Sequence, residues 1–223
     1  LAIIRNIFSI GWPAGVLQML WQLSALALFL IISALSQNNI EILAAFTNGL
    51  KIESVIFLPA FAFNMASAVV VGNLLGKNNQ EDAFSGGIVT ALAGVMIVSA
   101  LTVMVMFNGR YVAALISNND IVIRESMRYI YIALLAEPVM AWGVILAGGL
   151  NGAGDTKSVM TAVVLSVWLV RVPLSYLLGV YFKLGAPAIW WSMNLSILLQ
   201  AVLITKRYFS KKWFAVKHIE PAV

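Results

Sequence analysis

The sequence contains no cysteine and a single histidine, His218, which lies close to its C-terminal end. Without cysteine the chain cannot form disulfides, thiolate metal sites or a cysteine nucleophile. A catalytic or metal-bound histidine needs oriented partners, and no second imidazole exists to complete a metal site. We therefore expect His218 to be solvated, and we expect no metal site and no organic cofactor.

Charged residues are also scarce, at 10% of the 223 residues, whereas a soluble domain carries about 25%. Hydrophobic residues make up 61% of the chain, and the mean hydropathy is +0.94. These charges are too few to cover a surface exposed to water, so lipid must contact most of the outside. The composition predicts an integral membrane protein whose main partner is the lipid bilayer.

Motifs for nucleotide chemistry are absent too. The glycine-rich run at residues 148–152 follows a predicted helix rather than a strand, so it does not make a phosphate-binding loop. The net charge of +5 is concentrated near the C-terminus, and in a membrane chain this indicates orientation rather than a nucleic-acid partner. We expect no enzymatic activity, no ATP hydrolysis and no nucleic-acid binding.

Six segments are long and apolar enough to cross a bilayer as helices, which takes about 20 residues each. They cover residues 10–35, 44–75, 83–107, 129–150, 159–182 and 187–205, and short polar links join them. Residues 108–128 mix apolar and polar residues, which predicts an amphipathic segment at the membrane interface. The predicted fold is all-α and polytopic, with a six-helix transmembrane lobe at residues 1–208 and a basic tail at residues 209–223.

Lysine and arginine residues in the links indicate the orientation. The side that holds both termini collects eight of them, and the other side collects four. The positive-inside rule therefore predicts that both termini lie in the cytoplasm, for a multi-pass protein of the inner (plasma) membrane. Trp213 and Phe214 in the basic tail are expected to anchor it at the interface. The first residue, Leu1, is not methionine, which suggests that the chain is a fragment.

Four ionisable residues fall inside the predicted spans, namely Lys51, Glu53, Glu137 and Arg171. Such residues are costly in lipid, so each is a functional candidate. A carboxylate whose access to water alternates can exchange H⁺ or Na⁺, and we assign cation coupling to Glu137 and Glu53. Pro138 follows Glu137 directly and interrupts the backbone beside that carboxylate. The alternative is a structural salt bridge between helices, for example between Glu137 and Arg171.

Other polar residues are weaker candidates for lining a substrate cleft. Asn64 follows Glu53 by three helical turns and therefore lies on the same face of its helix. Gln18 and Gln22 lie one turn apart on the first helix, where their amides could bind a substrate or a neighbouring helix. Arg171 is the remaining cleft candidate, with a structural role as the alternative.

Several motifs resemble the multidrug and toxic compound extrusion (MATE) family. The resemblance rests on residues 59–77 (PAFAFNMASAVVVGNLLGK), 136–138 (AEP), 148–157 (GGLNGAGDTK), 168–174 (WLVRVPL) and 11–13 (GWP). It covers essentially the whole chain, and the GAGDTK segment is its most specific part. We assign the glycine-rich stretches at residues 72–76 and 152–154 to cytoplasmic turns and to helix packing.

The resemblance implies a fold of twelve helices in two six-helix lobes, with the substrate in a cleft between them. This chain is similar to the C-terminal lobe, so its partner would be the missing N-terminal lobe. The implied activity is secondary antiport, in which drugs or other amphipathic, cationic organic compounds leave the cell in exchange for Na⁺ or H⁺.

The chain departs from the family in one respect. Some members place acidic residues on the first and fourth helices of this lobe. Here the first helix carries Gln18, Trp21 and Gln22 but no carboxylate, and the fourth carries Glu137, about one turn from the family's acid. Coupling could therefore reside in the other lobe.

Two other functions remain open. A lipid-linked oligosaccharide flippase of the same superfamily would need several cationic residues for a pyrophosphate, and only Lys51 and Arg171 are available. A non-transporting or channel-type membrane subunit, or a subunit of a pump, would show no coupled exchange of its own.

Overall fold

The computed structural model describes residues 2–35 and 38–215, apart from the side chains of residues 2–11, 13 and 14. Helices make up most of this part of the chain, and it contains no strand. The elements are α1 (Ala2–Ser33), α2 (Asn39–Gly76), α3 (Gln80–Ile116), α4 (Asp120–Leu134), α5 (Glu137–Gly152), α6 (Thr156–Val164), η1 (Leu165–Arg171), α7 (Val172–Leu174), η2 (Ser175–Tyr181), α8 (Ala186–Phe209) and η3 (Lys212–Ala215). His218 lies outside the described residues.

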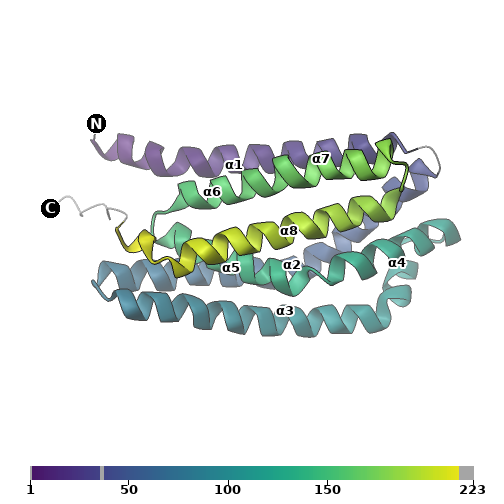
Figure 1. Cartoon of the computed structure of the whole chain (residues 1–223). Coiled ribbons are helices and arrows are strands. Elements are labelled where there is room, and N and C mark those ends of the chain that lie inside the picture. Colours follow the sequence, from purple (N-terminus) through teal and green to yellow (C-terminus); the bar gives the residue numbers. More distant parts are fainter. Residues whose placement is uncertain (1, 36–37, 216–223) are drawn as a thin grey trace.

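The helices form one elongated bundle and run roughly along a common axis (Figure 1). The start of α1, the α2–α3 turn, the α5–α6 turn and the end of α8 all lie at one end of this bundle (Figure 1). Helix α2 packs most extensively, against α3 and α5. An even number of crossings therefore separates the two ends of the described chain.

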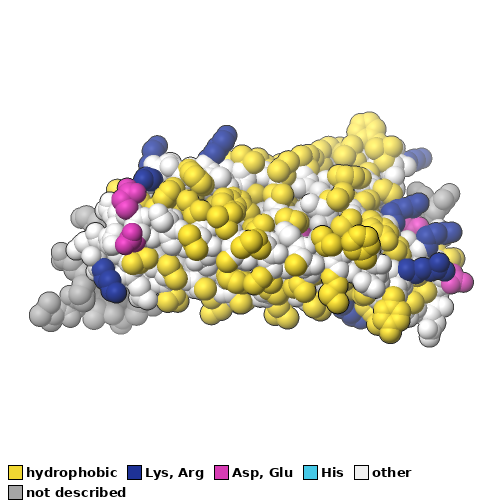
Figure 2. Space-filling view, turned by 90° about the horizontal axis from the view of Figure 1, so that it is seen from below, with side chains coloured by type: hydrophobic (Ala, Val, Ile, Leu, Met, Phe, Trp, Pro, Cys, Tyr) yellow, Lys and Arg dark blue, Asp and Glu magenta, His cyan; other side chains and the backbone are white. Residues whose placement is uncertain are grey.

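The number of membrane crossings agrees with the sequence prediction. Five helices are long and apolar enough to span a bilayer, and the α4–α5 pair, bent by 53°, makes up to six when it is taken as one span. A broad hydrophobic surface covers the middle of the bundle, with basic and acidic side chains towards both ends (Figure 2). The chain is thus a six-helix membrane lobe.

The fourth predicted span, at residues 129–150, is interrupted beside Glu137, as Pro138 indicated. The helix breaks between Leu134 and Glu137. Pro138 explains the break, because its nitrogen carries no hydrogen for the carbonyl four residues earlier and its ring crowds that carbonyl. The fourth span is therefore two helices, and its carboxylate Glu137 lies at the joint.

The segment at residues 108–128, predicted as one amphipathic stretch at the membrane interface, is divided between two helices. Residues 108–116 extend α3, which contains 37 residues and so measures about 55 Å, well beyond a hydrocarbon core of about 30 Å. Helix α4 then begins at Asp120, where the Asn119 side chain accepts hydrogen bonds from the backbone N–H groups of Ile121 and Val122. The polar residues mark a helix end and a new helix start.

The fifth span, which runs from Thr156 to Tyr181, contains two π-helical stretches, η1 and η2. At the end of η1 the N–H of Val172 donates to the carbonyl of Val167, five residues earlier. Pro173 comes next and cannot donate a backbone hydrogen bond, so a widened turn here avoids its clash with the preceding turn. This local geometry sets the position of Arg171, the last residue of η1.

The residues that follow α8 pack against the lobe. The Trp213 side chain is fully buried, and its Nε1 donates to the Tyr208 carbonyl at 2.7 Å. Tyr208 in turn donates to the Phe84 carbonyl at 3.0 Å, and Lys211 pairs with Glu81 at 3.1 Å. Trp213 thus packs against protein rather than lying at the membrane interface as an anchor. The tail predicted to begin at residue 209 packs against the lobe as far as residue 215.

Close contact between α2 and α5 depends on glycine. A Cβ atom at Gly148 would collide with the backbone carbonyl of Asn64, and one at Gly152 would collide with that of Ala68. Small residues let membrane helices approach closely enough for extensive van der Waals contact. The glycine-rich end of α5 therefore serves packing, as the sequence indicated.

We predict that Gly148→Ala destabilises the lobe by about 1–3 kcal/mol, because the methyl group meets rigid backbone that cannot move aside. The measurement is the thermal unfolding midpoint of the purified protein in detergent. Gly76→Ala is the matched control, since no atom lies within 4 Å of a Cβ at that position. Equal midpoints for the two variants would contradict this account of the α2–α5 contact.

Candidate functional site

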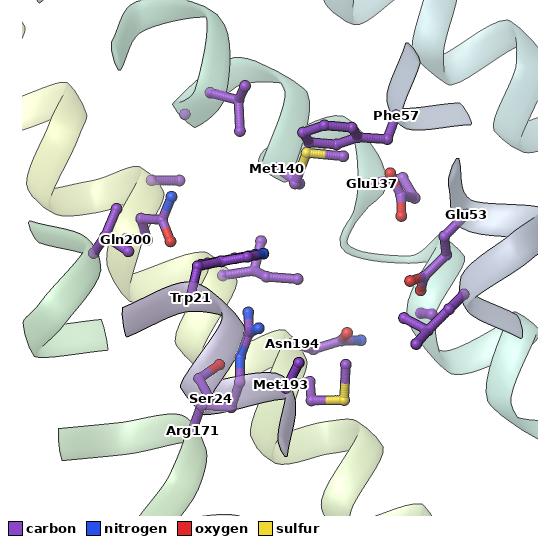
Figure 3. Close-up of a pocket in the computed structure, with 18 of the residues that line it drawn as sticks. Trp21, Ser24, Glu53, Phe57, Glu137, Met140, Arg171, Met193, Asn194 and Gln200 are labelled. Carbon is purple, nitrogen blue, oxygen red and sulfur yellow. The ribbon is translucent and has the colours of Figure 1, made fainter. Parts of the chain in front are cut away.

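A cavity of about 540 Å³ lies inside the bundle, between α1, α2, α4, α5, α8 and the helix from α6 to η1. Most of its lining is apolar, and its ionisable residues other than tyrosine are Glu53, Glu137 and Arg171. Figure 3 shows the two glutamates together on one side of the cavity and Arg171 on another. The three come from α2, α5 and η1, so tertiary structure brings them together.

The structure brings five of the six site residues expected from the sequence to this cavity. Those that line it are Gln18, Glu53, Asn64, Glu137 and Arg171. Gln22 is exposed and is not among the lining residues, so the structure does not bring it into this cavity beside Gln18. The packing of α1 places the two glutamines differently although they are one turn apart.

Helix α2 places Glu53 and Asn64 on one face, as their spacing predicted. Glu53, Phe57 and Asn64 all line the cavity, whereas Lys51 is exposed and points elsewhere. The Asn64 amide also donates to the Val144 carbonyl of α5 at 2.6 Å. Asn64 therefore joins two helices as well as lining the cavity.

Glu137 is the first residue of α5 and is only 5% exposed. The N-terminus of a helix carries partial positive charge, which favours a carboxylate there. Its Oε2 atom has no hydrogen-bond partner among the described residues. Glu53 lies near enough to interact with Glu137 electrostatically, so the two acidic groups share one region of the cavity.

The salt bridge between Glu137 and Arg171, considered as an alternative, does not form. In the part of the chain that the structure describes, the ion pairs join Arg124 and Arg128 to Glu125, Arg207 to Asp155, and Lys211 to Glu81. None of these pairs involves a charged residue of the cavity. The charged side chains of the cavity, Glu53, Glu137 and Arg171, therefore do not form ion pairs with one another.

Arg171 is 6% exposed and is held by two contacts. Its Nε donates to the Ser196 hydroxyl of α8 at 2.8 Å. Its guanidinium lies over the Trp21 ring of α1, at 5.1 Å from the ring centroid. A cation over an indole face is favoured electrostatically, so Trp21 stabilises the buried charge.

Sequence reasoning missed Tyr129, which lines the cavity beside Glu53. Its ring is fully buried and packs edge-on against Phe46 and Trp190, with centroids at 5.5 Å and 4.7 Å. Its hydroxyl makes no hydrogen bond of good geometry in the described structure. Gly49 could have signalled this contact, because any side chain there would overlap the tyrosine ring.

Asn194 was also missed. Its amide donates to the carbonyl of Ile132 at 2.6 Å, close to the break between α4 and α5. A helix break leaves carbonyls without their usual partners, and buried carbonyls need replacements. The position of this asparagine within the apolar segment at residues 187–205 is the feature of the sequence that could have identified it.

The MatE family model matches residues 13–177 of the chain. The probable multidrug resistance protein NorM of Bradyrhizobium diazoefficiens is 29% identical over 171 residues, which cover 74% of this chain and 36% of the relative. A probable NorM of Thermotoga maritima is 24% identical over 213 residues, which cover 94% and 44% of the two chains. The chain spans less than half the length of these relatives.

The fold is similar to that of solved transporters. The MATE transporter ClbM, determined in complex with Rb⁺, superposes with a TM-score of 0.87 at 19% identity. The match covers 96% of this chain and 50% of ClbM. The described lobe therefore has the architecture of half such a transporter.

We predict that Asn194→Ala lowers the stability of the purified protein by about 1 kcal/mol, because it leaves the partly buried Ile132 carbonyl without a partner. The midpoint of thermal unfolding in detergent measures this loss. Asn108→Ala is the control, since the Asn108 amide bonds only within its own helix at an exposed position. The account is wrong if Asn194→Ala unfolds at the midpoint of the unmodified protein.

Proposed function

The chain belongs to the MatE family, whose members are transporters rather than enzymes, and on that basis we propose that it exports amphipathic organic cations in exchange for Na⁺ or H⁺. The observation that carries this proposal is the pair of carboxylates, Glu53 and Glu137, in one cavity with no ion-pair partner among the described residues. The coupling ion and the substrate both carry positive charge, so both can use these groups.

The chemistry of the cavity supports a cationic, aromatic ligand. Trp21, Phe57, Tyr129 and Trp190 supply aromatic surface, and apolar side chains complete much of the lining. Aromatic rings attract cations as well as apolar surfaces. Relatives are named as multidrug resistance proteins, and ClbM was solved with a monovalent cation, Rb⁺.

The exchange follows from competition for the same carboxylates. Two nearby carboxylates in a mostly apolar cavity repel each other when both are ionised, so a proton, Na⁺ or an organic cation is favoured there. Binding of one cation displaces another that needs the same oxygen atoms. Antiport results if each cation favours a different conformation of the whole transporter.

The α4–α5 joint is the element that we assign to this conformational response. Glu137 lies at the joint, and the Asn194 side chain of α8 bonds to Ile132 just before it. A change in charge at Glu137 alters the balance between bent and straighter forms of the span. A bistable element of this kind can convert a local binding event into a global change.

We further propose that a second six-helix lobe, preceding this one, completes the transporter, since the chain spans less than half of its relatives. The proposed location is the inner (plasma) membrane, with the α2–α3 and α5–α6 turns in the cytoplasm. Lys77 directly follows α2, Lys157 lies at the start of α6, and Lys206 and Arg207 lie in the last turn of α8, in keeping with the positive-inside rule.

The cavity argues against a pyrophosphate-carrying flippase. Its lining holds two glutamates and one arginine, and Lys51, the other basic candidate, is exposed outside it. Like charges would repel a phosphate from most of the ionisable lining. A vesicle assay that measures both gradient-driven export and ionic current distinguishes antiport from conduction by a channel-type subunit.

We predict that Glu137→Gln lowers ion-coupled export at least tenfold, because it removes a charge-assisted contact to the coupling cation. The assay uses everted vesicles from cells that express the complete gene, loaded with a fluorescent organic cation under imposed Na⁺ or pH gradients. Glu41→Gln is the control, since Glu41 lies outside the cavity near the start of α2.

Coupled transport at the unmodified rate in Glu137→Gln contradicts the role assigned to this residue. Ionic current without gradient-driven export of the cation would favour the channel-type alternative instead.

A further inference from the structure

Helix α4 carries two exposed arginines on the side of the helix that faces away from the cavity. Arg124 and Arg128 lie one turn apart, and their side chains are 70% and 53% exposed. Tyr129 and Ala133 line the cavity, and their spacing from Arg124 places them near the opposite side of a helix with 3.6 residues per turn. The export mechanism uses neither arginine, so their presence needs an explanation of its own.

The two arginines lie at the depth of the lipid headgroups. The stretch from Arg128 to the end of α5 at Gly152 measures roughly 36 Å as helix, whereas the hydrocarbon core is about 30 Å thick. Figure 2 shows basic side chains gathered at the end of the bundle where α4 begins. This end faces away from the cytoplasm in the proposed orientation, so the positive-inside rule does not account for the two arginines.

Glu125 holds the two guanidinium groups without neutralising both of them. Its side chain is 11% exposed, and its carboxylate lies 3.4 Å from Nη1 of Arg128 and 3.9 Å from Nε of Arg124. The negative charge is thus buried beneath two exposed positive charges. Asp120, the other acid of α4, forms no ion pair with Arg124 in the described part of the chain and lies in the first helical turn, where the helix N-terminus stabilises it. The exposed face at the arginines therefore attracts an anion.

The chemistry of this face matches a phosphate group above an acyl chain. Arginine presents five N–H donors in a planar fork that matches phosphate oxygen atoms. In the described structure Arg128 donates to Glu125 through Nη1, so most donors of the two arginines remain open. Tyr131 and Leu135 continue the same face towards the middle of the membrane and are 42% and 55% exposed. A soluble anion would contact the arginines alone, whereas a phospholipid would also cover this apolar strip.

We propose that this α4 face binds an anionic phospholipid, whose phosphate contacts Arg124 and Arg128 and whose acyl chain lies along Tyr131 and Leu135. Helix α3 borders the strip closely, since a Cβ atom at Gly109 would lie 3.8 Å from the Tyr131 hydroxyl. The lipid carries net negative charge, because the ammonium group of a zwitterionic lipid would be repelled by the same arginines. The site lies beside the α4–α5 joint, and it does not depend on the proposed export function.

The test measures which helix an anionic lipid contacts. The product of the complete gene is reconstituted in phosphatidylcholine vesicles that contain a trace of phosphatidylglycerol with a photoactivatable diazirine on one acyl chain. Peptides that are labelled on irradiation are identified by mass spectrometry. We expect the α4 peptide to be labelled. Excess unlabelled phosphatidylglycerol should suppress this labelling, whereas added phosphatidylcholine should not.

The double variant Arg124→Gln/Arg128→Gln should lower the labelling of the α4 peptide about tenfold or more, because both charge-assisted contacts to the phosphate are lost. Arg124→Gln alone keeps the pair between Arg128 and Glu125, so it tests the site even if the double variant unfolds, and we expect a smaller loss. Lys183→Gln is the matched control, since Lys183 is exposed at the same end of the bundle, between η2 and α8. It should leave the labelling of α4 unaltered.

Unchanged labelling of α4 in both the single and the double variant overturns the proposal. Suppression by phosphatidylcholine as strong as that by phosphatidylglycerol also overturns it, because the face would then accept any phospholipid. Equal suppression by soluble glycerol 3-phosphate would show that the arginines bind a free phosphate group and would contradict the assignment to a lipid.

Discussion

The cost of keeping charge inside a bundle surrounded by lipid is the constraint on which this structure depends. Glu53, Glu137 and Arg171 lie in one cavity, and within the described chain no ion pair neutralises any of them. Two of them are partly compensated: Glu137 by the N-terminus of its helix, and Arg171 by Ser196 and Trp21. We propose that a bound ligand supplies the rest of the compensation, and on this basis we assign the cavity as a binding site.

Irregular helix geometry places these charges. The break before Pro138 sets Glu137 at the start of a helix, and the π-helical turns around Pro173 set the position of Arg171. Asn194 satisfies a carbonyl near the break, and glycines at 148 and 152 allow α5 to approach α2. Structural departures from regular helix thus coincide with the residues assigned to transport, as is common at functional sites.

Much of the fold and part of the site could be predicted from the sequence, because charge and hydropathy act locally. Charged residues within apolar runs identified Glu53, Glu137 and Arg171, and helical spacing placed Asn64 with Glu53. The rest depends on packing between helices that are distant in the sequence. Gln22 lies outside the cavity because the face that α1 presents to it depends on the neighbouring helices. Tyr129 joins the site only through its contact with α2 at Gly49. The division of residues 108–128 between α3 and α4 could not be predicted, because polar residues occur both at helix ends and on exposed helix faces.

The central claim is that Glu53 and Glu137 act on the same bound cation. A double-mutant cycle tests it most directly, by measuring the equilibrium affinity of a fluorescent aromatic amine for the purified protein and for Glu53→Gln, Glu137→Gln and the double variant. The account predicts that the losses of affinity caused by the two substitutions do not add. The double variant should bind the amine about as weakly as whichever single variant binds it more weakly. Losses that simply add would show that the two carboxylates bind independently and would contradict the shared site.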